Sequence, residues 1–474
     1  MLFNSLHFAF FFIVTTIIYF LLPHKYRWLF LLAISCYFYM VFVPVYILIL
    51  AFTILVDYAA GILIEKNPAH KKGLLALSIV VNVGFLCFFK YFNFLNGNLT
   101  VLLGTFAAKN PIPALNILLP IGLSFHTFQA MSYTIEVYRG NQKAEKHLGI
   151  YALYVMFYPQ LVAGPIERPQ NMIHQFYQKI DFDYDRVVSG LKLILWGLFK
   201  KVVIADRLSL YVDAIYNNPT HHSGISSIVA TIFFTFQIYC DFSGYSGIAI
   251  GTARVLGIDL MENFRRPYLA ASIREFWGRW HISLSTWFRD YLYIPIGGSR
   301  VNVGKHMRNL FVVFIISGLW HGANWTFIIW GALHGTYQVI ELVLNKYILK
   351  KDPKQPPKKG IATLPNFIIT FILVAIAWVF FRANNVTDAF TIMRNIFTLK
   401  PGPLFIGFAA GFVYSILLII FLVVSEINQE YFQNRYSLMY NRMPAIRYTG
   451  YVLLIVTMLM VGVFNGGQFI YFQF

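Results

Sequence analysis

Apolar runs long enough to cross a lipid bilayer recur along the whole chain. A spanning helix needs about 20 predominantly apolar residues, and only 12% of the 474 residues are charged, against about 25% in soluble domains. Such runs lie near residues 4–22, 28–43, 46–64, 73–96, 113–138, 148–164, 188–205, 227–256, 310–338, 362–381, 403–425 and 449–466. The sequence therefore predicts an all-α polytopic membrane protein with about eleven or twelve spans, forming a single membrane-embedded domain over residues 1–474.

The first apolar run differs from a secretory signal. Residues 1–28, MLFNSLHFAFFFIVTTIIYFLLPHKYRW, contain neither a basic n-region nor a small-residue cleavage site. We therefore expect a retained first span and not a removed signal peptide.

The net charge of +18 is distributed over the loops between the spans. Scattered basic residues in a membrane protein follow the positive-inside bias, so no nucleic-acid partner is expected and the lipid bilayer is the predicted surrounding. Residues 257–309 mix arginines with tryptophans and tyrosines, which is typical of short interfacial helices on the cytoplasmic side.

The charge pattern leaves two interpretations of residues 310–338. The basic segments 257–309 and 339–361 both favour the cytoplasmic side, yet only this one apolar stretch separates them. It is long for one crossing and short for two. Either it crosses once, tilted, and one loop breaks the positive-inside rule, or it bends back around the motif at 317–325.

An ionisable residue lies inside that stretch. Residues 317–325, SGLWHGANW, place His321 between Trp320 and Trp325, with glycines and Asn324 that permit close backbone approach. Ionisable residues inside membrane segments are costly and point to functional sites. His321 is either a neutral core histidine bonded to a carbonyl or a general base toward a hydroxyl or thiol in a dry channel walled by the tryptophans.

A second histidine, His281, lies in the aromatic and basic segment REFWGRWHISLSTWFRDYLY, residues 274–293. On a helix Trp277 and His281 would share one face at i, i+4. The segment is either an interfacial amphipathic helix with a histidine at its polar boundary, or the cytoplasmic mouth of a tunnel. In the second case His281 would be the polar group that positions a donor.

A metal site is not expected. His334 follows His321 at a spacing that prevents a shared metal unless the segment folds back, so we interpret it as structural with a supporting role. The other His, Cys, Asp and Glu residues lack zinc-ligand spacing, and Cys36, Cys87 and Cys240 lie in separate apolar segments as expected for packing thiols.

Other polar residues occur within apolar segments. Gln129, His126 and Glu136 are expected to form hydrogen bonds between helices, and Asp241, the costliest of these residues to bury, needs a partner. The chain contains no GxSxG elbow, Walker loop or dinucleotide fingerprint, which argues against serine-triad chemistry and nucleotide hydrolysis.

The carboxyl end, GGQFIYFQF at residues 466–474, is uncharged and aromatic. It is either an anchor at the membrane interface or a tail that tucks into the protein. The second alternative would place the hydroxyl of Tyr471, or the terminal carboxylate, in a cavity.

Several motifs in order along the chain resemble one family. They are LPIGLSFHTFQAMSYTIEVYRG (119–140), FYPQLVAGPIERP (157–169), WHISLSTWFRDYLYIPIGG (280–298), SGLWHGANWTFIIWGALHG (317–335), WVFFRA (378–383) and the terminal FIYFQF. Together they resemble bacterial membrane-bound O-acyltransferases, in the branch of the alginate O-acetylation protein.

The resemblance implies a fold and a site. The fold is a ring of tilted helices around a central tunnel, where cytoplasmic and external funnels meet near a histidine. The motif histidine of the family falls on His321 and a second one on His281. Trp320, Asn324, Trp277, Trp280 and Arg289 would line the tunnel or contact the donor, and Tyr471 would receive the acyl group.

The resemblance also implies an activity. The donor is acetyl-CoA from the cytoplasm, with no permanently bound cofactor, and the location is a bacterial inner membrane. A separate periplasmic or extracellular SGNH-type O-acetyltransferase would modify the polysaccharide, which could be alginate, peptidoglycan or cellulose. The alternatives are D-alanyl transfer from a carrier protein to teichoic acid, a secondary transporter or lipid flippase, and a purely structural export subunit. His126 stands where this branch is expected to have Tyr or Phe, which leaves the acceptor open.

Overall fold

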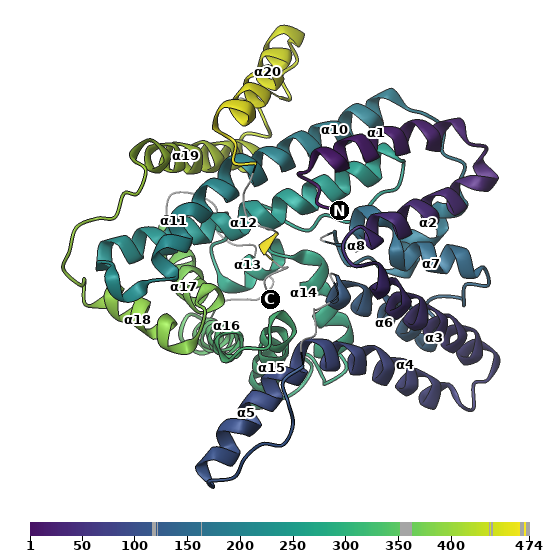
Figure 1. Ribbon diagram of the computed structural model, residues 1–474, viewed down its shortest axis with the longest axis horizontal. Helices are drawn as coiled ribbons and strands as arrows, with labels where there is room; N and C mark the ends of the chain where they lie inside the picture. The colour runs from purple at the N-terminus through teal and green to yellow at the C-terminus, as the bar shows by residue number, and fades with distance from the viewer. Residues whose placement is uncertain are drawn as a thin grey trace. The chain divides into compact units, whose positions relative to one another are not determined.

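The computed structural model describes residues 1–115, 120, 122–162, 164–350, 363–435, 437, 439–464 and 469–470. These residues form helices joined by turns, and no strand occurs among them. The α-helices, all but α9 labelled in Figure 1, are α1 Leu6–Leu21, α2 His24–Met40, α3 Ile47–Lys66, α4 Lys71–Leu86, α5 Phe92–Thr105, α6 Leu123–Arg139, α7 Leu148–Met156, α8 Tyr158–Leu161, α9 Pro169–Met172, α10 Tyr184–Leu198, α11 Asp206–Tyr216, α12 Gly224–Val255, α13 Ile273–Arg279, α14 Ile282–Phe288, α15 Val303–His321, α16 Trp325–Val343, α17 Leu364–Arg382, α18 Val386–Phe397, α19 Ala409–Tyr431 and α20 Pro444–Val461.

Seven helical runs within the described residues have the length and apolar composition of a membrane span. They are Pro44–Lys66, Lys71–Thr105, Gly224–Val255, Trp325–Ile348, Leu364–Arg382, Ala409–Tyr431 and Pro444–Val461, with Leu6–Leu21 as a shorter apolar helix. The protein is therefore all-helical and polytopic, as predicted, but the larger number of spans expected from the sequence is not confirmed.

Two of the expected spans differ from simple crossings for local reasons. The run 148–164 is interrupted after α7, because Pro159 lacks an N–H and is accommodated in the first turn of the new helix α8. The run 188–205 continues from α10 into a π-helical segment, η4 (Phe199–Ala205), that carries the buried charges of Lys200 and Lys201.

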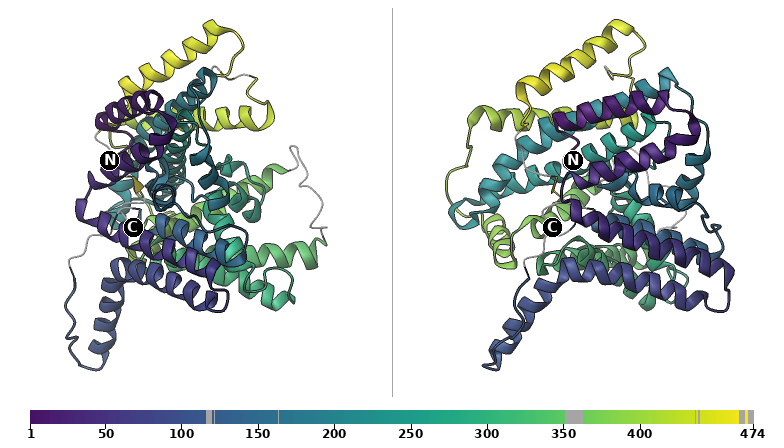
Figure 2. Two further views of the ribbon diagram at one scale, coloured as in Figure 1. Left: turned by 90° about the vertical axis from the view of Figure 1, so that its right-hand side faces the viewer. Right: turned by 45° about the vertical axis from the view of Figure 1, so that its right-hand side comes forward.

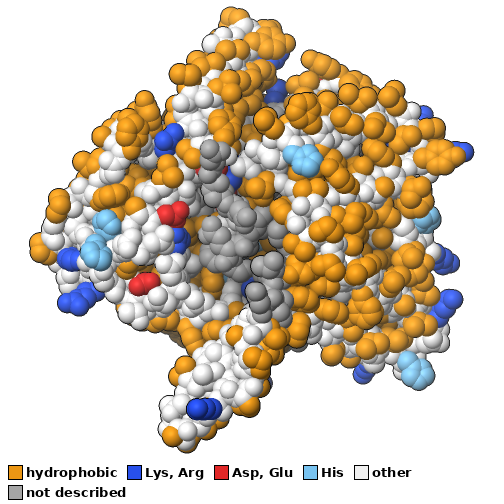
Figure 3. Space-filling model, viewed as in Figure 1, with side chains coloured by type: hydrophobic (Ala, Val, Ile, Leu, Met, Phe, Trp, Pro, Cys, Tyr) orange, Lys and Arg blue, Asp and Glu red, His pale blue; other side chains and the backbone are white. Residues whose placement is uncertain are grey.

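The chain divides into two compact units. Unit 1 comprises Met1–Leu195 and Tyr245–Met261, and unit 2 comprises Trp196–Gly244 and Glu262–Phe474. In unit 1, α3 and α4 pack against each other and against α6 (Figure 2). The outward residues of α3, such as Leu48 and Phe52, are exposed, and Figure 3 shows the hydrophobic side chains that cover this face. Such a surface suits lipid contact and not water.

In unit 2, α15 and α16 form an antiparallel hairpin with its bend at residues 322–324. Glycines allow the close approach: a Cβ at Gly318 would lie 2.3 Å from the Phe327 carbonyl oxygen, and one at Gly331 would lie 2.3 Å from the Phe314 carbonyl oxygen. Of the two interpretations of 310–338, the structure has the bent one. The basic segments 257–309 and 339–361 therefore join the hairpin at the same end. The positive-inside bias favours this arrangement, because both segments are then on one side of the membrane.

Two of the three polar residues predicted to join helices in unit 1 do so, but His126 forms no hydrogen bond to another helix among the described residues. Gln129 of α6 donates to the Tyr154 carbonyl of α7, and Glu136 accepts from Asn141 and from Gln170.

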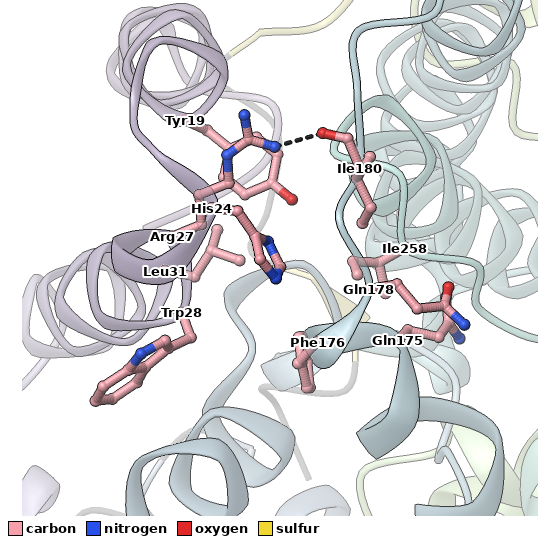
Figure 4. A pocket seen from close by; sticks show the side chains of 10 residues that line it. All are labelled: Tyr19, His24, Arg27, Trp28, Leu31, Gln175, Phe176, Gln178, Ile180 and Ile258. Carbon is pink, nitrogen blue, oxygen red and sulfur yellow. Dashed lines mark hydrogen bonds between the residues drawn. The ribbon is translucent and has the colours of Figure 1, made fainter.

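Unit 1 also contains a small pocket with mixed polar and apolar lining (Figure 4). Arg27 of α2 lines it, and the guanidinium donates to the carbonyls of Leu22, Phe20 and Ile180. Since these contacts are all to backbone oxygens, Arg27 serves to join α2 to the segment at Ile180.

Candidate active site

His281 lies at the junction of α13 and α14. Its backbone is left-handed, with φ of +43°, and its side chain is completely buried. A non-glycine residue in this conformation is strained and is held by its surroundings. The expected i, i+4 arrangement of Trp277 and His281 on one continuous helix is therefore wrong, because the helix ends at Arg279 and His281 caps the next one.

Asn263 orients the His281 ring. The Asn263 side-chain oxygen accepts from the Ser283 backbone N–H at 3.2 Å and from the Ser283 hydroxyl at 2.9 Å, and it lies 3.2 Å from His281 Nδ1. A backbone N–H can only donate, so this Asn263 atom is the amide oxygen and His281 Nδ1 must carry the proton. The lone pair is then on Nε2.

Burial also determines the charge of this ring. It lowers the pKa of His281 from 6.5 to about 3. Near neutral pH His281 is therefore a neutral imidazole whose Nε2 can accept a hydrogen bond. Asn263 was not predicted from the sequence, where nothing distinguishes it from other loop amides.

His321 lies at the last position of α15 and is 4% exposed. Its ring centroid is 4.9 Å from those of Trp320 and Trp330 and 5.3 Å from that of Phe381. The predicted apolar walls are therefore present, but one of them was assigned wrongly. Trp325 is 52% exposed, and Trp330 takes its place because the chain reverses direction at Gly322.

The structure brings the two predicted histidines to the same aromatic ring. The Trp320 centroid lies 4.9 Å from that of His321 and 6.3 Å from that of His281. Two imidazoles that are distant in sequence thus pack near one buried tryptophan ring.

His334 supports this region, as its predicted structural role implied. Trp277 Nε1 donates to His334 Nδ1 at 3.2 Å, and the Trp330 ring lies between His321 and His334, with its centroid 4.9 Å and 5.0 Å from theirs. Trp280 packs on Trp378 at 5.0 Å between centroids. Trp277 and Trp280 are therefore buried wall residues of one aromatic cluster.

Two other predicted residues lie at more open positions. Asn324 caps α16 by accepting from the Thr326 N–H at 3.0 Å, and its side-chain nitrogen donates to the Asn384 carbonyl at 3.1 Å. Arg289 has a side chain that is 59% exposed and forms an ion pair with Asp290.

Comparison with known proteins identifies the family. Residues 69–384 match the model of the membrane-bound O-acyltransferase family, and both His281 and His321 fall within the matched region. The chain belongs to this family.

The names of its relatives also indicate enzymes that transfer acyl groups. The chain is 39% identical to the probable alginate O-acetylase AlgI of Pseudomonas aeruginosa over 84% of its own length and 75% of the relative. It is 36% identical to the peptidoglycan O-acetyltransferase of Helicobacter pylori over 78% and 74% of the two chains. It is 27% identical to the teichoic acid D-alanyltransferase of Bacillus subtilis over 57% and 71%. The protein is therefore an enzyme, and its relatives support a membrane O-acetyltransferase.

The carboxyl-terminal segment of this acyltransferase reaches the same site. Phe469 and Ile470 are buried, and the Phe469 ring lies 5.6 Å from that of Phe242, which in turn lies 4.6 Å from that of His281. At these two residues the tail is tucked into unit 2. Tyr471, the predicted acyl acceptor, lies outside the described residues.

Proposed function

We propose that this enzyme takes an acetyl group from cytoplasmic acetyl-CoA and passes it across a bacterial inner membrane, where it is used to O-acetylate an extracytoplasmic polysaccharide. The observation that carries the proposal is the pair of buried histidines, His281 and His321, which both pack near the Trp320 ring. Acyl transfer to a hydroxyl requires a neutral base in a water-poor site.

His321 is the proposed catalytic base. It removes the proton from the acceptor hydroxyl as the oxygen attacks the thioester carbonyl, the carbon–sulfur bond breaks, and the coenzyme A thiolate takes up that proton as it leaves. His281 offers Nε2 as a second acceptor, which would orient the donor or the acceptor hydroxyl. The rings of Trp320, Trp330 and Phe381 exclude water and so suppress hydrolysis of the thioester.

The donor is proposed to enter from the basic side. Arginine and lysine residues of 257–309 attract its phosphates. Arg266 and Arg279 form ion pairs with Glu430 and are largely covered, whereas Arg289 pairs with the neighbouring Asp290 and keeps a side chain that is 59% exposed. Arg289 is therefore the residue of this segment that we assign to donor binding.

Tyr471 is the proposed acyl acceptor within the chain. It follows the buried residues Phe469 and Ile470 in the sequence, and the Phe469 ring packs against Phe242, which contacts the His281 ring. From Tyr471 the acetyl group would pass to a separate SGNH-type transferase outside the membrane.

The test uses purified enzyme in lipid nanodiscs with radiolabelled acetyl-CoA. We expect label on the carboxyl-terminal peptide, located at Tyr471 by mass spectrometry, and its loss in Tyr471→Phe and His321→Ala variants that remain folded. Wild-type labelling in His321→Ala would overturn the base assignment, and acetyl transfer at the wild-type rate in Tyr471→Phe would overturn the relay.

D-alanyl transfer from a carrier protein is the second candidate, because a teichoic acid D-alanyltransferase is among the relatives. It has less support, since this similarity covers 57% of the chain against 84% for the alginate O-acetylase. Supplying either acetyl-CoA or a D-alanyl carrier protein to the same nanodiscs separates the two. The family match favours an enzyme over a transporter, a flippase or a structural subunit.

A further inference from the structure

A buried charge cluster in unit 2 lies outside the histidine pair. Lys201 Nζ is 2.7 Å from Asp206 Oδ1 and 2.8 Å from Asp241 Oδ1, and none of the three side chains is more than 4% exposed. Two carboxylates thus share one ammonium group. The second negative charge has no positive partner of its own among these three side chains. Burying it is costly unless further hydrogen-bond donors stabilise the carboxylates.

The carboxyl-terminal segment supplies such a donor. The Ile470 backbone N–H donates to Asp241 Oδ2 at 2.7 Å, so one oxygen of this carboxylate takes the lysine and the other takes the main chain of the tail. The preceding residue, Phe469, is completely buried and packs against Phe242, the residue that follows Asp241. Asp241 and Phe242 therefore hold the tail by its backbone and by its aromatic side chain.

The same part of unit 2 also binds the residues that lead from α20 into the carboxyl-terminal segment. The Val463 N–H donates to the Val202 carbonyl of η4 at 2.8 Å, and Arg207 of α11 donates to the Val461 carbonyl at the end of α20. A π-helical turn departs from the regular i→i−4 pattern of hydrogen bonds and often marks a functional position. The segment from Lys201 to Arg207 thus contributes to both attachments of the tail.

We propose that Lys201, Asp206 and Asp241, together with the Val202 carbonyl, form a docking site that holds the carboxyl-terminal segment in one register beside His281. The site binds the main chain through a charge-assisted hydrogen bond and takes an aromatic side chain next to it. These residues are positioning residues. The proposed purpose, presenting Tyr471 for acylation, rests on the proposed function.

The charge balance offers a variant that should fold. In Asp241→Asn, Lys201 keeps Asp206 as its partner, so one positive and one negative charge remain. The Ile470 N–H then loses its charged acceptor. Since a hydrogen bond to a charged group contributes more than a neutral one, amide hydrogen exchange of peptides containing Phe469 and Ile470 should become about 10-fold faster.

A second variant tests the other attachment without changing any charge. Val463→Pro removes the N–H that donates to Val202, and Gly462 already has the extended conformation, with φ of −62° and ψ of 146°, that a residue before proline adopts. We expect faster exchange of the same peptides. Glu426→Gln is the matched control, because it also converts a buried acid to its amide but at a residue that accepts from Tyr239; its exchange at the tail should match the wild type.

The measurements are made in nanodiscs without donor, so they do not depend on catalysis. Wild-type exchange rates at the tail in both Asp241→Asn and Val463→Pro would overturn the docking site. Faster exchange in these variants and not in Glu426→Gln would support it. Tyr471→Phe, assayed separately with acetyl-CoA, tests the relay alone, so the two proposals can fail independently.

Discussion

The side-chain oxygen of Asn263 and Nδ1 of His281 lie 3.2 Å apart, and the same oxygen accepts the Ser283 backbone N–H. This arrangement fixes which nitrogen of the imidazole carries the proton. The acceptor role proposed for Nε2 of His281 therefore depends on a residue that is 18 positions earlier in the chain. Around metal sites, mutation of a residue that orients a ligand imidazole typically lowers metal affinity or activity by about 10- to 100-fold. We expect a roughly similar loss of acetyl transfer here.

The first prediction concerns Asn263→Asp and Asn263→Leu. The leucine variant removes the acceptor, and acetyl transfer should fall by about 10- to 100-fold. The aspartate variant keeps the acceptor but adds a negative charge, which stabilises the protonated imidazole and raises the pKa of His281. The acid limb of the pH–rate profile should therefore move to higher pH. Asn395→Leu, at a buried amide that donates to the Pro219 carbonyl, is the control for general destabilisation. An unchanged profile in Asn263→Asp would show that Asn263 does not set the ionisation of the site.

The second prediction concerns the α15–α16 hairpin. In Gly318→Ala the new methyl group would lie 2.3 Å from the Phe327 carbonyl oxygen, so the helices must separate. We expect a loss of about 1–3 kcal/mol in the free energy of unfolding and, because His321 follows on the same helix, reduced activity. Gly304→Ala is the control on the same helix, since its nearest neighbour would be 3.8 Å away. Thermal unfolding of the two variants in detergent measures the difference, and equal midpoints would contradict the close packing.

Much of the membrane architecture could be predicted from local patterns. Hydropathy identifies α3, α12, α17, α19 and α20, because each long apolar run needs no partner elsewhere in the chain to be recognised. The bend at Gly322 could also be expected as one alternative, since the positive charge on both flanking segments favours a hairpin. His321 could be predicted as a site residue from its position alone, because it is an ionisable group among apolar residues.

The partners of these residues could not be predicted in this way. Trp330 replaces Trp325 as the wall of His321 only because two helices fold back on each other, and Lys201 meets Asp241 from a different segment of unit 2. His281 has a left-handed backbone that no local sequence signal marks. Contacts between distant segments depend on tertiary packing, which periodicity and composition do not encode.

The third prediction concerns water exclusion around His321. Trp330 lies between His321 and His334 and is completely buried. In Trp330→Phe the smaller ring leaves space beside the imidazole, and water should compete with the acceptor for the thioester. We expect hydrolysis of acetyl-CoA to rise several-fold relative to transfer. Trp325→Phe makes the same substitution at the exposed tryptophan of the hairpin and should keep the wild-type ratio. Equal ratios in both variants would mean that Trp330 is not a wall of the reacting space.

The fourth prediction concerns the dependence of stability on pH. The pKa of His281 is about 3 in the folded protein, against 6.5 for a free histidine, because burial disfavours the charged ring. Between these values the unfolded chain binds a proton that the folded protein does not. The free energy of unfolding should therefore fall as the pH decreases below about 6.5, by up to about 1.4 kcal/mol per pH unit from this residue.

His281→Gln removes the titrating ring and keeps a polar side chain, so its free energy of unfolding should depend less steeply on pH between about 6.5 and 5. The exposed His174→Gln provides the control for the loss of an imidazole elsewhere in the chain. Denaturant unfolding in detergent at several pH values measures the slopes. If the His281→Gln and wild-type curves run parallel over this range, folding does not lower the pKa of His281, and the buried neutral imidazole inferred for this position would be wrong.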